Sequence, residues 1–265
     1  SNRLNELGVR FNLNEMYLGT FHSICLRWLE EYREYTRLKR NYILMDQFDQ
    51  QFFLYRSLGE YDKIEGADQI MGKRGSSWYR SATLLKWINT VSEEALDPKT
   101  LYAAPDATVR ALGACALHYH CQLDEENALD FSTIQYEALR LLENNPQVLA
   151  ALRAKITYLM VNEYQDTNTI QEHILLLLAG ENPNLCVVGD DDQGLYRFRG
   201  ATIRNILEFP KHFADGVCKQ VRLTVNYRSH PDIIHFYNRW IGEKDWDANG
   251  QRFRCLKCLA DFDRC

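Results

Sequence analysis

The sequence YLMVNEYQDTN at residues 158–168, followed after a helical spacer by LCVVGDDDQGLYRFR at 185–199, decides the fold of this chain. Each part begins as a short apolar run, which is typical of a buried strand in a parallel sheet. Each then ends abruptly in carboxylates and amides, at residues 162–166 and 190–193. Open α/β sheets place their chemistry beyond the carboxyl ends of their strands. The pattern therefore predicts a site for a metal ion and a polyphosphate.

Composition places the chain among soluble globular proteins, with 46% hydrophobic and 25% charged residues in 265. No apolar run approaches the ~18–20 residues that a membrane span needs, and no signal peptide is evident. We therefore expect a cytoplasmic protein with no membrane partner. The net charge of −5 argues against a surface coated uniformly for nucleic acid but allows a local basic groove. Scattered cysteines are expected to be reduced core thiols: Cys25, Cys115, Cys121, Cys186 and Cys218.

The remaining chain divides by its periodicity. A strand is expected at 16–18 and a helix from about Ser23, whereas residues 41–125 show helical spacing and no convincing strand. Helices and strands then alternate, with a third strand expected at 221–225, which indicates a parallel sheet. Asp46 is expected to cap one helix, and Thr167 or Asn168 is expected to cap the helix that follows the first acidic cluster.

Two groups of residues receive a structural interpretation from their pattern. The basic run of Arg33, Arg37, Lys39 and Arg40 is expected to be a solvated helix face. The aromatic residues of the helical block are expected to belong to its core rather than to a binding stripe. They include Phe48, Phe52, Phe53, Tyr55, Trp78 and Trp87.

The acidic clusters carry the chemistry that the sequence predicts. Glu163 can position and deprotonate a water for attack on a phosphoryl group. Gln165 and Gln193 can donate to phosphate oxygens. Asn162 stands where a Mg²⁺ ligand would be expected, and its neutral amide is a weaker ligand than a carboxylate. One cluster alone is more typical of a solvated acidic loop, but two clusters at consecutive strand ends favour a site.

Aromatic and basic residues follow the second cluster and the third expected strand. Tyr196, Phe198 and Arg199 combine groups that stack on bases and pair with phosphates. Tyr227 and Arg228 combine a group that can stack on a nucleobase with a cation that can stabilise a transferring phosphate. For each group an ordinary helix edge or strand-to-helix turn remains an alternative.

Two further motifs carry weaker signals of a binding site. The sequence GTFHS at 19–23 places hydroxyls and backbone N–H groups at a helix start, where phosphates can bind. His22 by itself is more typical of a hydrogen-bonded structural residue than of a catalyst. Cys255, Cys258 and Cys265 lack the second cysteine pair of a strong zinc signature, so an irregular tail is favoured over a metal site.

Four of these motifs, GTFHS at 19–23, VNEYQDTN at 161–168, VGDDDQGLYRFRGA at 188–201 and the segment 223–229, resemble in order successive motifs of the UvrD/Rep/PcrA-like superfamily 1 DNA helicases. The resemblance covers most of residues 1–240. It implies an α/β fold with a parallel-sheet, RecA-like motor domain that is incomplete here and carries an inserted all-helical subdomain. It also implies an ATP-driven motor that moves 3′ to 5′ on single-stranded DNA, in DNA repair or replication.

The resemblance implies boundaries for each part of such a motor. Residues 1–25 would end the first part of motor domain 1A, and 26–125 would form the helical subdomain 1B. Residues 126–218 would complete domain 1A, 219–243 would begin domain 2A, and 244–265 would be an irregular tail.

The same resemblance implies roles on the ATP side. Glu163 would be the catalytic base, while Gln165 and Gln193 would sense the γ-phosphate. Tyr227 would stack on the adenine, and Arg228 would contact the γ-phosphate. The cofactors would be ATP and Mg²⁺.

On the DNA side, the partner implied is single-stranded DNA. Tyr196 and Phe198 would stack on its bases beside Arg199. Thr20 and His22 would line the path of its backbone.

Departures from the family pattern predict weak catalysis. The sequence contains no Gly-x-x-x-x-Gly-Lys-[Ser/Thr], so the main phosphate loop and its lysine are missing. The late arginine motif is also missing, Asn162 replaces the expected Mg²⁺-binding aspartate, and Gly194 replaces a serine. We therefore expect this chain alone to be deficient in ATP hydrolysis. The alternative is a non-catalytic module, derived from a helicase, that binds single-stranded DNA or a protein partner.

Overall fold

The computed structural model describes residues 16–180, 184–190, 193, 203–242, 247–248 and 251–252. The chain divides into two compact units. Unit 1 comprises residues 1–160 and 168–186, and unit 2 comprises 161–167 and 187–265. The structure confirms a mixed chain of helices and short strands with small parallel sheets.

Most of unit 1 is helical. Its helices are α2 (Phe21–Glu31), the 3₁₀ turn Arg33–Tyr35, α3 (Gln47–Tyr61), α4 (Ala67–Met71), α5 (Ser77–Glu93), α6 (Pro98–Tyr102), α7 (Ala107–Glu125), α8 (Phe131–Asn144), α9 (Pro146–Lys155) and α10 (Thr169–Ala179). Its strands are β1 (Ile43–Met45) and β2 (Ala128–Asp130), together with most of β3 (Leu159–Val161) and β4 (Leu185–Val187).

Local sequence signals set the helix ends, as predicted. Asp46 caps α3, and the Asp46 and Asp49 side chains each accept the other residue's backbone N–H in a capping box. Asn168 caps α10 in the same way with Gln171. That helix stops at Gly180, whose φ of 63° is left-handed and favours glycine. Caps of this kind satisfy backbone groups that a helix leaves without partners.

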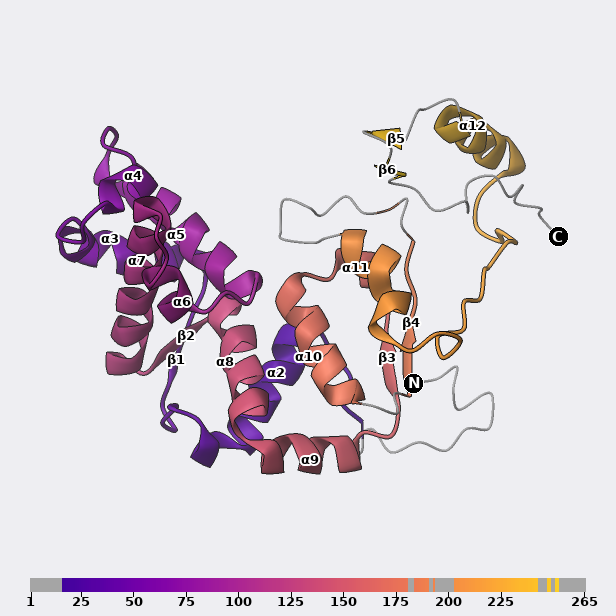
Figure 1. The fold of residues 1–265 in the computed structure, drawn as a ribbon, viewed down its shortest axis with the longest axis horizontal. Helices are drawn as coiled ribbons and strands as arrows, with labels where there is room; N and C mark the ends of the chain where they lie inside the picture. Colours follow the sequence, from indigo (N-terminus) through magenta and orange to yellow (C-terminus); the bar gives the residue numbers. More distant parts are fainter. Residues whose placement is uncertain are drawn as a thin grey trace. The chain divides into compact units, whose positions relative to one another are not determined.

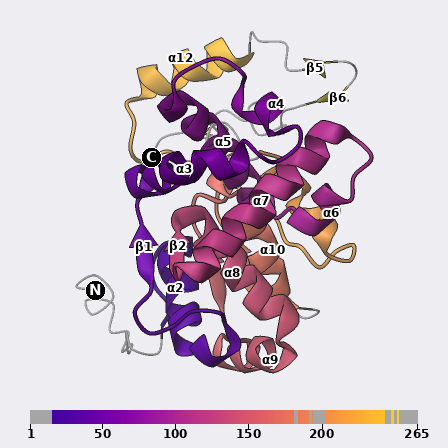
Figure 2. The ribbon, with the colours of Figure 1, turned by 90° about the vertical axis from the view of Figure 1, so that its left-hand side faces the viewer.

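The helices of unit 1 form two groups, each around its own hydrophobic cluster (Figure 1). The first cluster takes its buried residues mainly from α2, α8, α9 and α10, with Leu29, Leu142 and Leu152 fully buried. The second takes them mainly from α3, α4, α5 and α7, with Tyr61 and Tyr119 fully buried. The strands β1 and β2 lie between the two groups (Figure 2).

The pairing of β1 with β2 overturns one prediction. Residues 41–125 were expected to contain no strand, yet Ile43–Met45 pairs in parallel with Ala128–Asp130, with Leu44 opposite Leu129. A three-residue strand is too short to show a period in the sequence. It exists because two distant segments meet, which local propensity does not encode.

Two expected strands are wrong in the opposite sense. Residues 16–18 and 221–225 are irregular, and Leu18, Val221 and Leu223 are 78%, 82% and 78% exposed. The apolar run at 16–18 and the alternation at 221–225 do not produce strands, because no neighbouring strand of the described chain pairs with them. In unit 2 the described elements are the 3₁₀ turn Tyr164–Asp166, α11 (Ile203–Glu208), the 3₁₀ turn Phe209–His212, α12 (Pro231–Gly242), β5 (Asp247–Ala248) and β6 (Gln251–Arg252), besides the last residues of β3 and β4.

Several aromatic residues that were expected in the core are exposed. Phe48, Phe52, Tyr55 and Trp78 are 65%, 44%, 41% and 39% exposed, and their rings contact one another on α3 and α5. Phe53 is partly buried and packs edge-on against Tyr119, as a core residue does. The helical periodicity therefore predicts the helices correctly, but it does not predict which of their aromatic side chains are buried in the core.

The cysteines also differ in burial. Cys25 and Cys115 are buried free thiols, and burial raises the pKa of each to about 12. Cys121 and Cys186 are exposed, so they are not core thiols as expected. No helix in the described part of the chain has the length and apolar character for a bilayer crossing.

Arg37 overturns the expectation of a solvated basic face. Its Nε atom lies 2.7 Å from Asp124 Oδ1 and 3.0 Å from Glu137 Oε1. Its two terminal nitrogens donate to the carbonyl oxygens of Leu123 and Ala128, at 3.2 and 3.0 Å. The side chain is only 19% exposed, so this arginine ties the segment after α2 to the end of α7, to β2 and to α8.

We predict that Arg37→Leu lowers the free energy of unfolding by about 2–4 kcal/mol, because it leaves carboxylates and carbonyl groups without their shared donor. Arg40 is the matched control, since it is exposed and belongs to the same basic run. Arg40→Leu is expected to change stability by less than about 0.5 kcal/mol. Urea denaturation of both variants measures the difference. Equal stability of the two variants would contradict the role given to Arg37.

Candidate functional site

Two short strands bring the acidic clusters to one edge of a sheet. The strands β3 and β4 are neighbours, with Leu159 N bonded to Asn184 O at 2.9 Å and Val188 N bonded to Val161 O at 2.8 Å. These bonds advance along both strands together, so the strands are parallel. The backbone pairing continues past the strand ends, where Tyr164 N donates to Val188 O at 3.0 Å. The residues that follow β3 and β4 therefore lie side by side.

Gln165 connects the two clusters. Its side chain is 1% exposed. Its amide nitrogen donates to Glu163 Oε2 at 2.7 Å, and its amide oxygen accepts the backbone N–H of Asp190 at 2.9 Å. Gln193 then donates from its side chain to Asp190 Oδ2 at 2.9 Å. The structure thus brings three of the predicted site residues, Glu163, Gln165 and Gln193, into one hydrogen-bonded group.

Glu163 has an unusual backbone. It has φ 53° and ψ 46°, which is the left-handed conformation that residues other than glycine rarely adopt. It precedes the 3₁₀ turn Tyr164–Asp166 and is exposed, so its carboxylate is open to solvent while Gln165 holds one of its oxygens. Burial and the neighbouring Glu163 raise the pKa of Asp166. One Asp166 oxygen is buried without a hydrogen-bond partner.

Two residues that support this site were missed at the level of the sequence. Gly189 faces Gln165, and a Cβ at Gly189 would lie 2.6 Å from Gln165 Oε1 and 2.7 Å from Ile206 Cδ1. Asn205 is 3% exposed and donates from its side chain to the carbonyl and hydroxyl oxygens of Thr167, at 3.2 Å each. A glycine after a strand and an asparagine in a short helix give no distinctive sequence signal, because their roles depend on tertiary neighbours.

The GTFHS segment belongs to unit 1. Thr20 caps α2 by accepting the backbone N–H of Ser23 at 3.3 Å. His22 packs edge-on against Phe131, and its ring nitrogens lie 3.0 and 3.2 Å from the amide nitrogen of Gln135. Burial lowers the pKa of His22, although a hydrogen bond with the Phe131 backbone acts in the opposite direction. The predicted contact of His22 with DNA stays a prediction.

In the described part of the chain, no hydrogen bond or ion pair joins Tyr227 or Arg228 to this group. Tyr227 is 73% exposed and Arg228 is exposed, in a turn where Asn226 Oδ1 accepts the backbone N–H groups of Arg228 and Ser229 at 2.9 Å each. This turn leads into α12. Tyr196, Phe198 and Arg199 lie outside the described residues, as do Cys255, Cys258 and Cys265.

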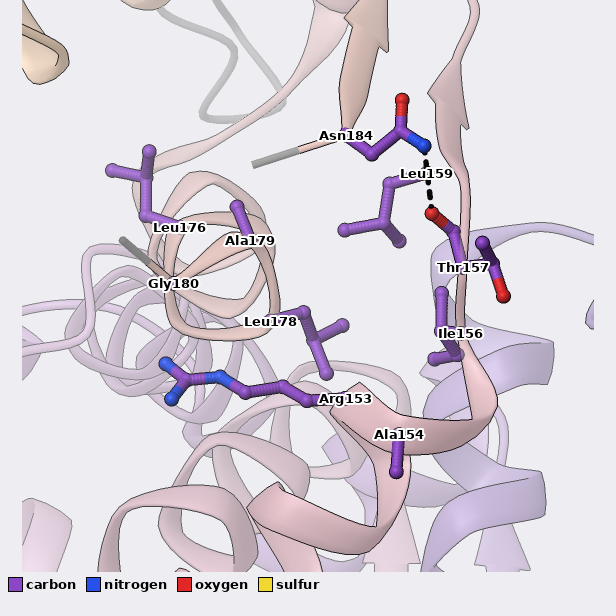
Figure 3. Close-up of a pocket in the computed structure, with 10 residues that line it drawn as sticks. All are labelled: Arg153, Ala154, Ile156, Thr157, Leu159, Leu176, Leu178, Ala179, Gly180 and Asn184. Atoms are coloured by element: carbon purple, nitrogen blue, oxygen red, sulfur yellow. Dashed lines mark hydrogen bonds between the residues drawn. The ribbon is translucent and has the colours of Figure 1, made fainter. Parts of the chain in front are cut away.

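A pocket of about 800 Å³ lies elsewhere, in unit 1 (Figure 3). It is lined by residues of α9 and α10, by Leu159 at the start of β3, and by the segments that lead into β3 and β4, including Thr157 and Asn184. This is the amino end of β3, whereas the acidic residues follow its carboxyl end. Its charged side chain, Arg153, already donates to the carbonyl of Leu177 at 2.9 Å. Without a carboxylate or histidine among its lining residues, the pocket is not the place for the predicted chemistry.

Residues 1–214 match the model of a protein family, described as the UvrD/REP helicase N-terminal domain. The chain belongs to the UvrD/REP helicase family. The predicted resemblance is therefore confirmed over four-fifths of the chain.

Individual UvrD/REP helicases agree with this assignment. The chain is 30% identical over 258 residues to the ATP-dependent DNA helicase PcrA of Staphylococcus epidermidis strain RP62A. It is 31% identical over the same length to the PcrA of Staphylococcus aureus strains Mu50 and NCTC 8325. Each alignment covers 94% of this chain and 34% of the relative. The chain thus spans about a third of the length of the curated relatives it matches.

We predict that Gly189→Ala destabilises the site, because the added methyl group would displace Gln165 or Ile206. The expected loss is about 1–3 kcal/mol in the free energy of unfolding. Gly59 in α3 is the matched control, since a Cβ there meets nothing within 4 Å. Gly59→Ala is expected to stabilise the chain by about 0.5–1 kcal/mol, since alanine favours the helix. Thermal or urea unfolding checks both signs, and a stabilised Gly189→Ala variant would refute the close packing.

Proposed function

We propose that this chain is part of an ATP-dependent DNA helicase that couples ATP hydrolysis to 3′-to-5′ movement on single-stranded DNA. The observation that carries the proposal is the buried Gln165 side chain, which holds Glu163 and Asp190 together at the carboxyl ends of two parallel strands. Membership in the UvrD/REP family and the names of the PcrA relatives support it.

The chemistry assigned to the site follows from its hydrogen bonds. Glu163 would accept the proton of the attacking water, because its carboxylate is exposed and Gln165 fixes its orientation. The Gln165 nitrogen carries two N–H groups and uses one on Glu163, so the second is the group that would meet a γ-phosphate. Gln193 is exposed and donates to Asp190, and it would contact the γ-phosphate from the segment that follows β4. Tyr227 would stack on adenine, and Arg228 would contact the γ-phosphate.

The residues around Glu163 fit a Mg²⁺ ion only in part. Among the described residues, no three histidine, cysteine or acidic side chains are grouped as metal ligands. Oxygen donors are nevertheless present in Asn162, which is exposed, and in Glu163 and Asp190. Magnesium keeps several waters and takes many of its ligands from substrate phosphates, so a site with few protein ligands is compatible with it. The ion would supply charge neutralisation for the transferring phosphate.

The proposal also covers the architecture. Residues 1–25 and 126–218 would belong to an incomplete RecA-like motor domain 1A, and 26–125 would be the inserted helical subdomain, 1B. Residues 219–243 would begin motor domain 2A. Thr20, His22, Tyr196, Phe198 and Arg199 would contact single-stranded DNA. A cytoplasmic location and a role in DNA repair or replication accompany this proposal.

A second candidate function is a non-catalytic module that binds single-stranded DNA or a protein partner. Asn162 favours it, because a neutral amide holds Mg²⁺ less well than a carboxylate. The aromatic and basic residues around Tyr196 favour it as well, because they can stack on bases and pair with phosphates. The first candidate requires that Glu163 and its hydrogen-bonded neighbours take part in ATP hydrolysis, whereas the second requires only binding.

We predict that the chain alone shows no DNA-stimulated ATP hydrolysis above background. Asn162→Asp is expected to restore none, because the missing phosphate-loop lysine would still leave the β- and γ-phosphates without their cradle. A phosphate-release assay with a single-stranded oligonucleotide measures this. Robust turnover by either chain, lost in Glu163→Gln, would refute the expected deficiency and would itself establish the catalytic role of Glu163.

We predict that the chain binds a single-stranded thymidine oligonucleotide at low salt and loses affinity as salt rises. Tyr196→Ala and Phe198→Ala are each expected to weaken binding about tenfold, which corresponds to the loss of one stacked base. Trp87→Ala is the control, since Trp87 is 45% exposed on helix α5 of the helical block. Fluorescence anisotropy checks the affinities. An undiminished affinity in both tyrosine and phenylalanine variants would exclude them from the DNA path.

A further inference from the structure

A row of hydrogen-bonded side chains, made of amides and one histidine ring, connects elements of the first helix group of unit 1. Gln135, on α8, is 2% exposed. Its amide nitrogen lies 3.0 Å from His22 Nε2 and 3.2 Å from Nδ1, and its amide oxygen accepts from the side chain of Gln171 at 3.4 Å. Gln171 in turn forms the capping box at Asn168. Four residues from three elements are therefore linked in a row.

The direction of every hydrogen bond in this row is fixed from one end. The backbone N–H of Asn168 can only donate, and it donates to Gln171 Oε1 at 3.3 Å. The Gln171 nitrogen must then face Gln135, and the Gln135 nitrogen must face His22. A ring nitrogen of His22 therefore accepts, which agrees with a neutral imidazole. The row is a single set of donors and acceptors with one consistent orientation.

The row ends at the start of α10, where the chain crosses from one unit to the other. The chain passes from unit 2 to unit 1 at the peptide between Thr167 and Asn168. The first turn of α10 has a second anchor, because the Thr169 hydroxyl donates to Glu94 Oε2 at 2.6 Å. Glu94 is the C-cap of α5, in the second helix group. The start of α10 is thus held from both helix groups, and Glu163 lies only a few residues before it.

We propose that Gln135 is a positioning residue that links the segment 20–23 to the first turn of α10 through hydrogen bonds. DNA bound at Thr20 and His22 would then alter the hydrogen bonds at the start of α10, a few residues after Glu163. The effect of bound DNA on α10, the sensing part of this proposal, rests on the proposed function. The link between the segment 20–23 and α10, the mechanical part, rests only on the hydrogen bonds. A buried amide that lost either neighbour would leave a polar group unsatisfied, so changes at His22 and at Gln171 are coupled through it.

Hydrogen exchange of backbone amides tests the mechanical part without DNA. His22→Phe keeps an aromatic ring against Phe131 but removes both ring nitrogens. It is expected to speed the exchange of the Asn168 and Gln171 amides about threefold to tenfold, the equivalent of one hydrogen bond. In a Gln135→Leu background the same change is expected to have no further effect. Equal acceleration in both backgrounds would overturn the proposal.

Gln50→Leu provides the matched control background. Gln50 is also a buried glutamine, at 4% exposure, and it donates to Asn89 at 2.8 Å in the second helix group. Its loss removes a comparable amide bond without touching the row. The effect of His22→Phe on Asn168 and Gln171 is therefore expected to persist in Gln50→Leu. If it vanishes there as well, general loosening of unit 1 replaces a specific role of Gln135.

A thymidine oligonucleotide tests the sensing part by NMR. Saturating oligonucleotide is expected to shift the Asn168 and Gln171 amides in the unaltered chain and in Gln50→Leu, and to leave them unshifted in bound Gln135→Leu. The same shifts in bound Gln135→Leu would overturn the sensing role. If no chain binds the oligonucleotide, the proposed DNA function fails, the sensing role falls with it, and the exchange experiment still decides the mechanical role.

Discussion

The buried amide of Gln165 is the interaction on which the candidate site depends. A primary amide can donate and accept at once, and Gln165 uses both ends, on Glu163 and on the Asp190 backbone. A carboxylate in its place would repel Glu163, and an apolar side chain would leave the Asp190 N–H without its partner. The pairing of β3 with β4 brings the two segments close, but the amide fixes how their polar groups face each other. Gly189 matters for the same reason, because its missing side chain leaves room for that amide.

The parts of this molecule that could be predicted from sequence are those with a local cause. Asp46 and Asn168 cap their helices through residues three positions away, so the signal and the structure lie in one short segment. The apolar runs before the acidic clusters likewise predicted neighbouring parallel strands. The family motifs added the site residues, and the structure groups Glu163, Gln165 and Gln193. Their roles in catalysis remain predictions.

The parts that could not be predicted depend on contacts between distant segments. Arg37 resembles any arginine in a basic run until Asp124 and Glu137 are placed beside it. The strand β1 exists because β2 lies next to it, while the alternating segment 221–225 has no such neighbour in the described chain. Gln135 has no local signal either, since its two partners come from α2 and α10. In each case tertiary pairing, which a single sequence does not display, decides the outcome.

The left-handed backbone of Glu163 places stability and chemistry in opposition at one residue. A side chain at φ 53° costs about 1 kcal/mol relative to glycine, so a sequence chosen for stability alone would not carry glutamate there. A designer who ranked substitutions by folding free energy would therefore select the change that removes the proposed base. In this protein, a substitution at position 163 that raises thermal stability would also remove the proposed base. A screen for more stable variants therefore needs a second measurement, of function.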